Sequence, residues 1–117
     1  MPRPLQPADP EAVTAALASD KPDRSELRLL TKHFLARLAQ RAPGRSVEVR
    51  VPPYAAVQVV EGVRHTRGTP PAVVELDAPT WIALATGELA WPEAVDAGRV
   101  RASGERADLS PYLPLQP

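Results

Sequence analysis

The amino-acid sequence predicts an α+β domain in which helices pack on one face of a mostly antiparallel sheet of four to five strands. Three observations lead to this prediction. Apolar residues recur at helical spacing in the first third of the chain, and an alternating pattern follows them. Helical segments that end in Gly then lead into one more alternating segment. Paired strands, then helices, then a returning strand are typical of helices that cover one face of an antiparallel sheet.

The length and composition predict one domain with an aliphatic core. A chain of 117 residues has room for one hydrophobic core. Apolar residues make up 44% of it, with one Phe, one Met, two Tyr and two Trp, so Ala, Val and Leu supply most of the core. Residues 1–8 are rich in proline and predict an extended, loosely held arm. We expect residues 9–117 to form the single domain.

Two helices are predicted before the first strand. Residues 9–11 place Asp at a cap, Pro in the first turn and Glu near the positive end of the helix dipole, so a short helix starts there and ends near Ser19. A longer helix runs from Pro22 or Asp23 to about Ala42, where a Pro-Gly pair ends it. Its apolar residues fall three or four positions apart and form one stripe: Leu27, Leu30, Phe34, Leu35 and Leu38.

Four segments alternate between apolar and polar residues and predict strands. Residues 46–51 and 54–60 are separated by a Pro-Pro pair, and this short connection predicts an antiparallel pair. Residues 72–76 predict a third strand, and residues 99–103, in which Val and Ala alternate with Arg and Ser, predict a fourth. Residues 108–113 predict a short final helix or turn.

Two further helices are predicted between the third and fourth strands. Asp77 caps the first of them, and Gly87 ends it. The second runs over about residues 92–97 and is closed by Gly98. Ala90 stands where a polar cap would be, so this helix lacks a capping bond worth ~1 kcal/mol.

Composition and motifs exclude several classes of function. The net charge is zero, with 14 basic and 14 acidic residues, so we expect no nucleic-acid partner. The absence of Cys excludes disulfides, thiol nucleophiles and Cys-type zinc sites. No signal peptide and no apolar run of ~20 residues is present, so we predict a cytoplasmic protein without stable membrane insertion. Twelve Arg against two Lys indicate a bacterial gene of high GC content.

The second half of the chain resembles a known family. Residues 77–115 are similar to the C-terminal half of the sterol carrier protein 2 family, in which a helix ends in Gly and an apolar residue follows. A short helix containing Ala and ending in Gly comes next, then a strand and another Gly. These points are occupied in order by Gly87, Leu89, Ala94, Gly98 and Gly104. The upstream part, from residue 45, resembles the compact bacterial branch of the family. The resemblance implies a lipid-binding or sterol-binding domain with an apolar tunnel between helices and sheet.

Nine apolar side chains are expected to point into the helix–sheet interior, where they either line a ligand tunnel or fill the core: Phe34, Leu38, Val57, Val59, Leu76, Trp81, Leu84, Tyr112 and Leu113. Burying a ten-carbon chain there would yield about 8 kcal/mol at ~0.8 kcal/mol per methylene. Keeping a cavity of ~300 Å³ empty would cost about 7 kcal/mol, close to the whole stability of a domain. We therefore expect that a ligand or a second subunit occupies this space, or that its walls collapse.

The polar residues offer little chemistry. The sequence contains no Gly-rich phosphate loop, no Gly-x-Ser-x-Gly motif and no His pair at metal-ligand spacing, so we predict no catalytic residue, no metal site and no cofactor. We expect His33 to be structural. Arg64, His65 and Arg67 lie near a Gly and either clamp a carboxylate or phosphate or belong to a surface loop. Arg99 and Arg101 are expected on the outward face of their strand, where they either lie on a solvated sheet face or make a weak contact with an anionic membrane or a partner.

Three functional hypotheses follow. The leading one is a non-enzymatic, sterol-carrier-like domain that binds a small apolar or lipid-like ligand between helices and sheet. The second is a protein-interaction module with a collapsed core, a homodimer whose contact surface includes Trp91 and the proline-rich arm. The third is an enzymatic or anion-binding role centred on Arg64, His65 and Arg67.

Overall fold

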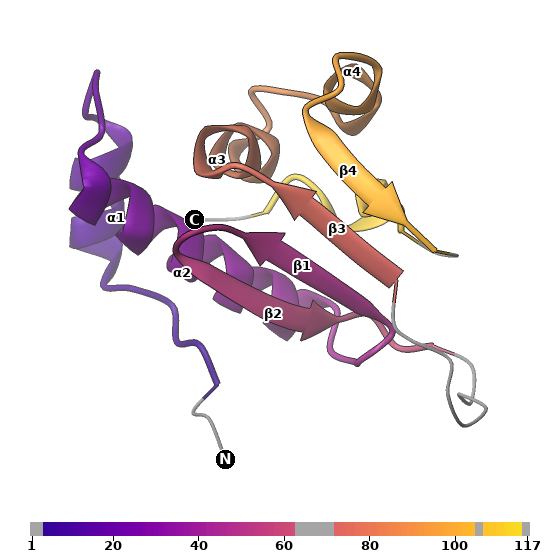
Figure 1. The fold of residues 1–117 in the computed structure, drawn as a ribbon. Coiled ribbons are helices and arrows are strands. Elements are labelled where there is room, and N and C mark those ends of the chain that lie inside the picture. The colour runs from indigo at the N-terminus through magenta and orange to yellow at the C-terminus, as the bar shows by residue number, and fades with distance from the viewer. Residues whose placement is uncertain (1–3, 63–71, 105–106, 116–117) are drawn as a thin grey trace.

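The computed structural model describes residues 4–62, 72–104 and 107–115, and it shows the α+β architecture that the sequence predicts (Figure 1). Two helices come first, a sheet follows, and two further helices precede the last strand. The elements in chain order are α1 (Pro10–Leu17), α2 (Arg24–Arg41), β1 (Val47–Val51), β2 (Ala55–Val59), β3 (Ala72–Leu76), α3 (Ala78–Thr86), α4 (Trp91–Asp96), β4 (Val100–Ser103) and the 3₁₀ turn η1 (Ser110–Tyr112).

The sheet is mixed. Its strand order is β2-β1-β3-β4. The outer pairs β1–β2 and β3–β4 are antiparallel, as expected, but the central pair β1–β3 is parallel. The reason is that β2 returns the chain to the end of the sheet where β1 starts, and β3 begins there, with the Ala72 N–H donating to the Ser46 carbonyl at 2.9 Å. Alternation within a strand does not show on which side of β1 the third strand is added.

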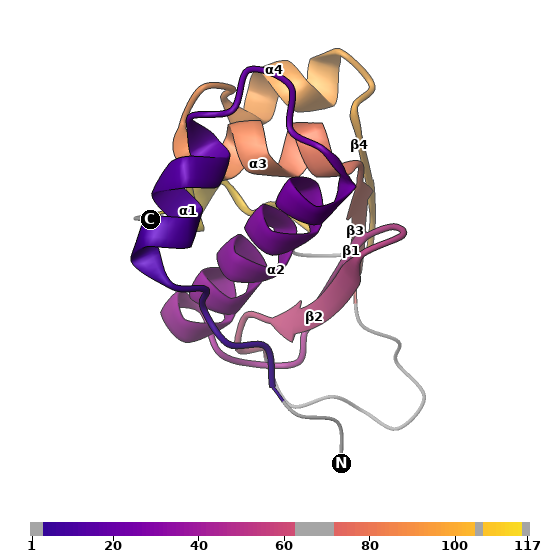
Figure 2. The same ribbon diagram turned by 90° about the vertical axis from the view of Figure 1, so that its left-hand side faces the viewer.

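The helices lie on one side of the sheet (Figure 2). On this face the strands bury apolar side chains: Val47, Val49, Val51, Val59, Ala72, Val74 and Leu76. The opposite face of β1 and β2 has the polar residues Glu48, Arg50 and Gln58. The two-residue alternation in the sequence therefore sorts the side chains as predicted.

Helix α2 is enclosed on more than one side. It contacts β2, α1 and α3, so that α1 forms an outer layer beyond α2 (Figure 2). Its buried residues accordingly extend beyond the single predicted stripe: Leu30, Thr31, His33, Phe34, Leu35, Ala36 and Leu38. Periodicity along one helix did not reveal this second contact face.

Both ends of α2 are fixed by specific contacts. At the start, the Asp23 side chain accepts from the Glu26 N–H at 2.9 Å and the Glu26 side chain accepts from the Asp23 N–H at 3.1 Å, which is a capping box. At the end, the Val60 N–H donates to the Ala42 carbonyl at 2.7 Å. A Cβ on Gly44 would lie 2.2 Å from the Val60 backbone, so this close approach requires glycine.

The last described segment, residues 107–115, closes the interior. The Leu115 N–H donates to the Ala85 carbonyl of α3 at 2.8 Å, and an Arg41 Nη1 N–H donates to the Pro114 carbonyl at 3.3 Å. Leu109 and Leu115 are both buried in the main hydrophobic cluster. The segment thereby joins α2, α3 and the sheet, although it is largely without regular structure.

Candidate ligand-binding interior

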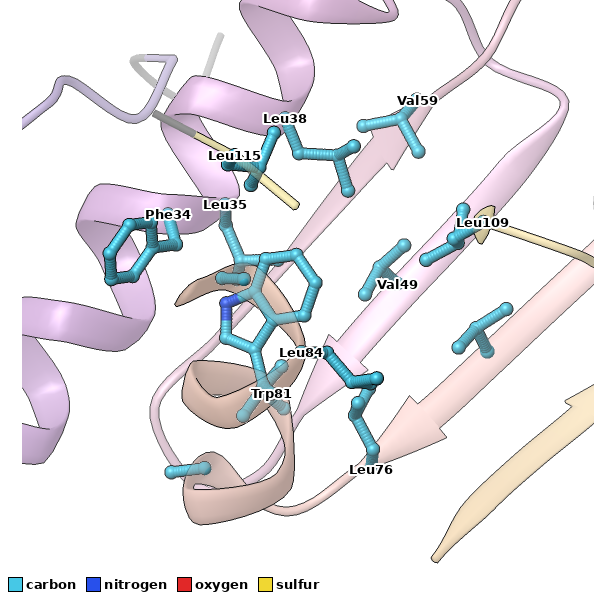
Figure 3. Packing of buried hydrophobic residues seen from close by; sticks show 14 of the residues in the cluster. Phe34, Leu35, Leu38, Val49, Val59, Leu76, Trp81, Leu84, Leu109 and Leu115 are labelled. Atoms are coloured by element: carbon cyan, nitrogen blue, oxygen red, sulfur yellow. The ribbon is translucent and has the colours of Figure 1, made fainter. Parts of the chain in front are cut away.

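The interior between helices and sheet is built from three sources. Helix α2 contributes Phe34, Leu35 and Leu38, and helix α3 contributes Trp81 and Leu84 (Figure 3). The third wall is the apolar face of the strands. The Trp81 indole is the largest of these side chains, and its N–H donates to the Thr31 carbonyl of α2 at 3.3 Å. This bond satisfies the one polar atom of the indole, so the ring presents an apolar surface to the interior.

The structure brings most of the nine predicted tunnel residues into this interior. Six of them are buried in one cluster: Phe34, Leu38, Val59, Leu76, Trp81 and Leu84. The other three are half-buried at its margin, packed against the same cluster: Val57, Tyr112 and Leu113. The predicted set therefore forms one contiguous group, which the chain assembles from α2, β2, β3, α3 and the C-terminal segment.

Four of these nine side chains have no exposed surface: Phe34, Leu38, Val59 and Trp81 are each 0% accessible. Because an adjoining space of water size would leave accessible surface, their neighbours fill the volume around these side chains. The walls of the interior are therefore in contact with one another. A ligand that binds among them must displace side chains or separate α3 and the C-terminal segment from the strands.

Sequence reasoning missed two residues of the interior. Leu109 is 0% accessible and Leu115 is 7% accessible, and both belong to the same cluster as Leu38 and Trp81. They lie in a segment with almost no regular structure, so no periodicity marks them as core residues. Their only signal is that they are Leu residues in a stretch otherwise rich in Ser, Pro and Asp.

His33 lies at the boundary between α2 and the N-terminal segment. Its Nδ1 accepts from the Ala8 N–H at 3.0 Å, and its ring meets Phe34 edge-on at a centroid distance of 4.9 Å. Its Nε2 and the hydroxyl of Thr31 are buried without a hydrogen-bond partner among the described residues. Burial lowers the pKa of His33, and the nearby Arg37 lowers it further. The neutral ring thereby attaches the end of the predicted arm to the domain.

Two arginines that the sequence placed on the last strand lie beside an open cleft of about 280 Å³. Arg101 and Glu75 are partners in register across β3 and β4, and Asp77 also lines the cleft. The Arg99 Nε donates to the Thr80 hydroxyl of α3 at 3.0 Å. The positive charges of the two arginines in this cleft are therefore balanced by the negative charges of Glu75 and Asp77.

The candidate anion site at Arg64, His65 and Arg67 lies outside the described residues. Within the described ranges, no three His, Cys, Asp or Glu side chains gather in a way that could hold a metal ion. No helix in the same ranges is long and apolar enough to cross a membrane.

Comparison with known proteins identifies the family. Residues 23–115 match the family model described as "Bacterial SCP ortholog", where SCP denotes sterol carrier protein. The match begins at the cap of α2 and ends at Leu115, so it includes the whole sheet, α3, α4 and the C-terminal segment. None of the curated proteins matches the chain. The matched region covers most of the chain and contains every wall of the interior described above, and the chain therefore belongs to the bacterial sterol carrier protein ortholog family.

Proposed function

We propose that the domain is a non-enzymatic carrier that binds a small apolar or lipid-like ligand between α2, α3 and the sheet. The observation that carries this proposal is an enclosed aliphatic and aromatic cluster in a member of the sterol carrier family. The ligand would contact the nine side chains named above, with Leu38 and Trp81 nearer the centre than Phe34 (Figure 3). A cytoplasmic location and a bacterial origin remain predictions from the sequence.

The ligand must be long enough that the free energy gained by burying its methylenes exceeds the free energy lost when the interior opens. Each buried methylene contributes ~0.8 kcal/mol, whereas each displaced core side chain loses a comparable packing contribution. The half-buried side chains Val57, Tyr112 and Leu113 have the least packing to lose. We expect the apolar ligand to enter at the margin of the cluster where these half-buried side chains lie.

Native mass spectrometry of protein purified from its own host tests the carrier proposal. We expect a co-purifying apolar molecule, and a rise in melting temperature on addition of fatty acids or sterols. Leu38→Ala creates space at the centre of the interior and should increase the stabilisation by small apolar ligands. Leu17→Ala is the matched control, because Leu17 lies on α1 and is 37% accessible. Absence of any bound lipid, together with no thermal shift in the native chain or Leu38→Ala, would contradict the proposal.

A second candidate function is supported by one specific observation. Four of the nine interior side chains have no accessible surface, as a protein-interaction module with a collapsed core would require. Its contact surface would include the half-buried Trp91 and the exposed Val95 on α4, and the proline-rich arm. Sedimentation equilibrium separates the two candidates, because a chain that stays monomeric at high concentration and binds lipid supports the carrier alone.

A further inference from the structure

Helix α2 buries a hydroxyl group that has no hydrogen-bond partner. The Thr31 side chain is 0% accessible, and its Oγ1 forms no hydrogen bond with any of the described residues. Thr80 is equally buried, but its hydroxyl accepts from the Arg99 Nε at 3.0 Å. The buried hydroxyl of Ser46 donates to the Val60 carbonyl at 2.6 Å. Because a hydroxyl that leaves water without a partner lowers the stability of a fold, the exception at Thr31 calls for a reason.

The usual local partner of a helical threonine is also missing. In a helix, a threonine hydroxyl commonly donates to the backbone carbonyl three or four residues earlier. Thr14 does so with the Pro10 carbonyl, and Thr86 with the Ile82 carbonyl, each at 2.9 Å. Among the described residues, the Thr31 hydroxyl makes no such bond. It therefore keeps its capacity both to donate and to accept.

This hydroxyl lies on the stripe of α2 that faces the ligand-binding interior. Thr31 precedes Leu35 by four residues and Leu38 by seven, so the three side chains follow one line along the helix. Both leucines are buried in the main cluster, and the Thr31 carbonyl accepts from the Trp81 indole N–H at 3.3 Å. Figure 3 shows Leu35 beside the indole ring. One polar group therefore interrupts the apolar wall next to its largest side chain.

The chemistry of a hydroxyl limits the group that it can bind. It donates one hydrogen bond and accepts up to two, so it can pair with an alcohol or a ketone oxygen. It carries no charge and cannot neutralise an ion. Burying an ionised carboxylate beside it would cost more than one hydrogen bond returns. An apolar molecule with one uncharged oxygen therefore matches this position.

We propose that the Thr31 hydroxyl binds a single uncharged oxygen, of an alcohol or a ketone, on the apolar ligand and thereby selects it over a hydrocarbon of the same size. This inference rests on the proposed carrier function and adds the residue that determines its specificity. The ligand oxygen lies beside Thr31 and Trp81, and the apolar part of the ligand contacts Leu35, Leu38 and the strands.

Titration with 1-decanol and with undecane, followed by tryptophan fluorescence, tests the role of Thr31. Undecane has a methyl group in place of the hydroxyl and the same number of heavy atoms. Thr31→Val keeps the shape of the side chain and removes its hydroxyl. Its affinity for decanol should fall about fivefold relative to the native chain, as is typical of one neutral hydrogen bond, and its affinity for undecane should not fall. Thr31→Ser keeps the hydroxyl and should retain the native ratio of the two affinities.

The matched control is Thr80→Val, which removes an equally buried hydroxyl from α3. It should bind both ligands as the native chain does. It should also lower the free energy of unfolding in the absence of ligand, because the Arg99 Nε loses its acceptor. Thr31→Val should leave the free energy of unfolding unchanged or raise it, because the hydroxyl that it removes has no partner among the described residues.

The outcomes separate this inference from the carrier proposal. Failure of the native chain to bind either ligand would overturn both. Binding of both ligands with the same ratio of affinities in the native chain and Thr31→Val would overturn the role of Thr31 and leave the carrier function standing. A loss of stability in Thr31→Val as large as in Thr80→Val would show that the hydroxyl already has a partner in the free chain, which also overturns the inference. An equal fall in decanol affinity in Thr80→Val would count against it as a general effect on the fold.

Discussion

Helices α3 and α4 have similar residues at their starts and ends but different positions in the molecule. Each has Pro in its first two positions and a Gly of positive φ at or just after its end, with φ of 87° at Gly87 and 71° at Gly98. Helix α3 buries five residues, including Trp81, whereas α4 buries only Ala94. The Asp77 side chain caps α3, and α4 has no side-chain cap, as its sequence predicted.

The difference shows which part of the molecule the interior depends on. Helix α3 packs against α2 and forms one wall of the ligand-binding interior, whereas α4 contacts β4, an edge strand exposed over most of its length. Local signals determine where each helix begins and ends, but burial determines how much each contributes to stability. Substitutions in the two helices should therefore have unequal effects.

The largest difference is expected between the two tryptophans. Trp81→Ala removes a fully buried indole from α3 and should lower the free energy of unfolding by about 3–5 kcal/mol. Trp91→Ala removes a half-buried ring at the start of α4 and should cost about 1 kcal/mol. Urea denaturation monitored by circular dichroism measures both. Equal losses would contradict the view that α3, and not α4, supports the interior.

The next effect concerns the cap of α3. The Asp77 carboxylate accepts from the Thr80 N–H at 2.9 Å, so Asp77→Ala leaves this donor without its partner. We expect a loss of about 1 kcal/mol in unfolding free energy. Asp77→Asn keeps a side-chain acceptor and should retain most of the stability in the same urea titration; a loss as large as that of Asp77→Ala would show that the carboxylate charge matters more than the bond.

A smaller gain is expected from supplying the missing cap of α4. Ala90→Asp adds a side-chain acceptor at the cap, where the backbone already has the extended conformation that capping residues adopt. Because α4 is weakly buried, the gain in unfolding free energy should be only about 0.5 kcal/mol. Hydrogen exchange of the α4 amides measures it locally, and unchanged protection there would contradict the prediction.

The smallest expected effect is a change of stability with pH, which arises from His33 on α2. Burial lowers the pKa of His33 below its ordinary value of 6.5. The unfolded chain therefore binds a proton more readily than the folded chain, and the stability contribution present above pH 6.5 declines as the pH falls below it. Thermal denaturation between about pH 7 and pH 5 should show this decline, and His33→Asn, which keeps an acceptor for Ala8, should reduce it. A decline of the same size in His33→Asn would assign the pH response to other groups.

Most element boundaries could be predicted from the sequence, because caps, terminating glycines and alternation are local signals. The parallel β1–β3 pair could not, since the side of β1 on which a strand is added depends on the path between Val59 and Ala72. The second buried face of α2 was missed for a similar reason. His33 and Thr31 are polar, and their surroundings come from distant parts of the chain: His33 Nδ1 accepts from the Ala8 N–H, and the Thr31 carbonyl accepts from the Trp81 indole of α3.

The candidate site was predictable to the extent that its residues lie in regular elements. Phe34, Leu38 and Trp81 follow helical periodicity, and all three are buried in the same cluster. Leu109 and Leu115 follow no period and were missed, although both contact the interior.

The position of Leu109 and Leu115 has a consequence for synthesis on the ribosome. The strands and α2 are translated first, but two of the residues that complete their core come from the last nine described positions. Until these residues leave the exit tunnel, apolar side chains of α2 and the sheet stay open to chaperones and to other nascent chains. The interval between translation of β4 and release of Leu115 is therefore the period when this chain is most exposed to aggregation.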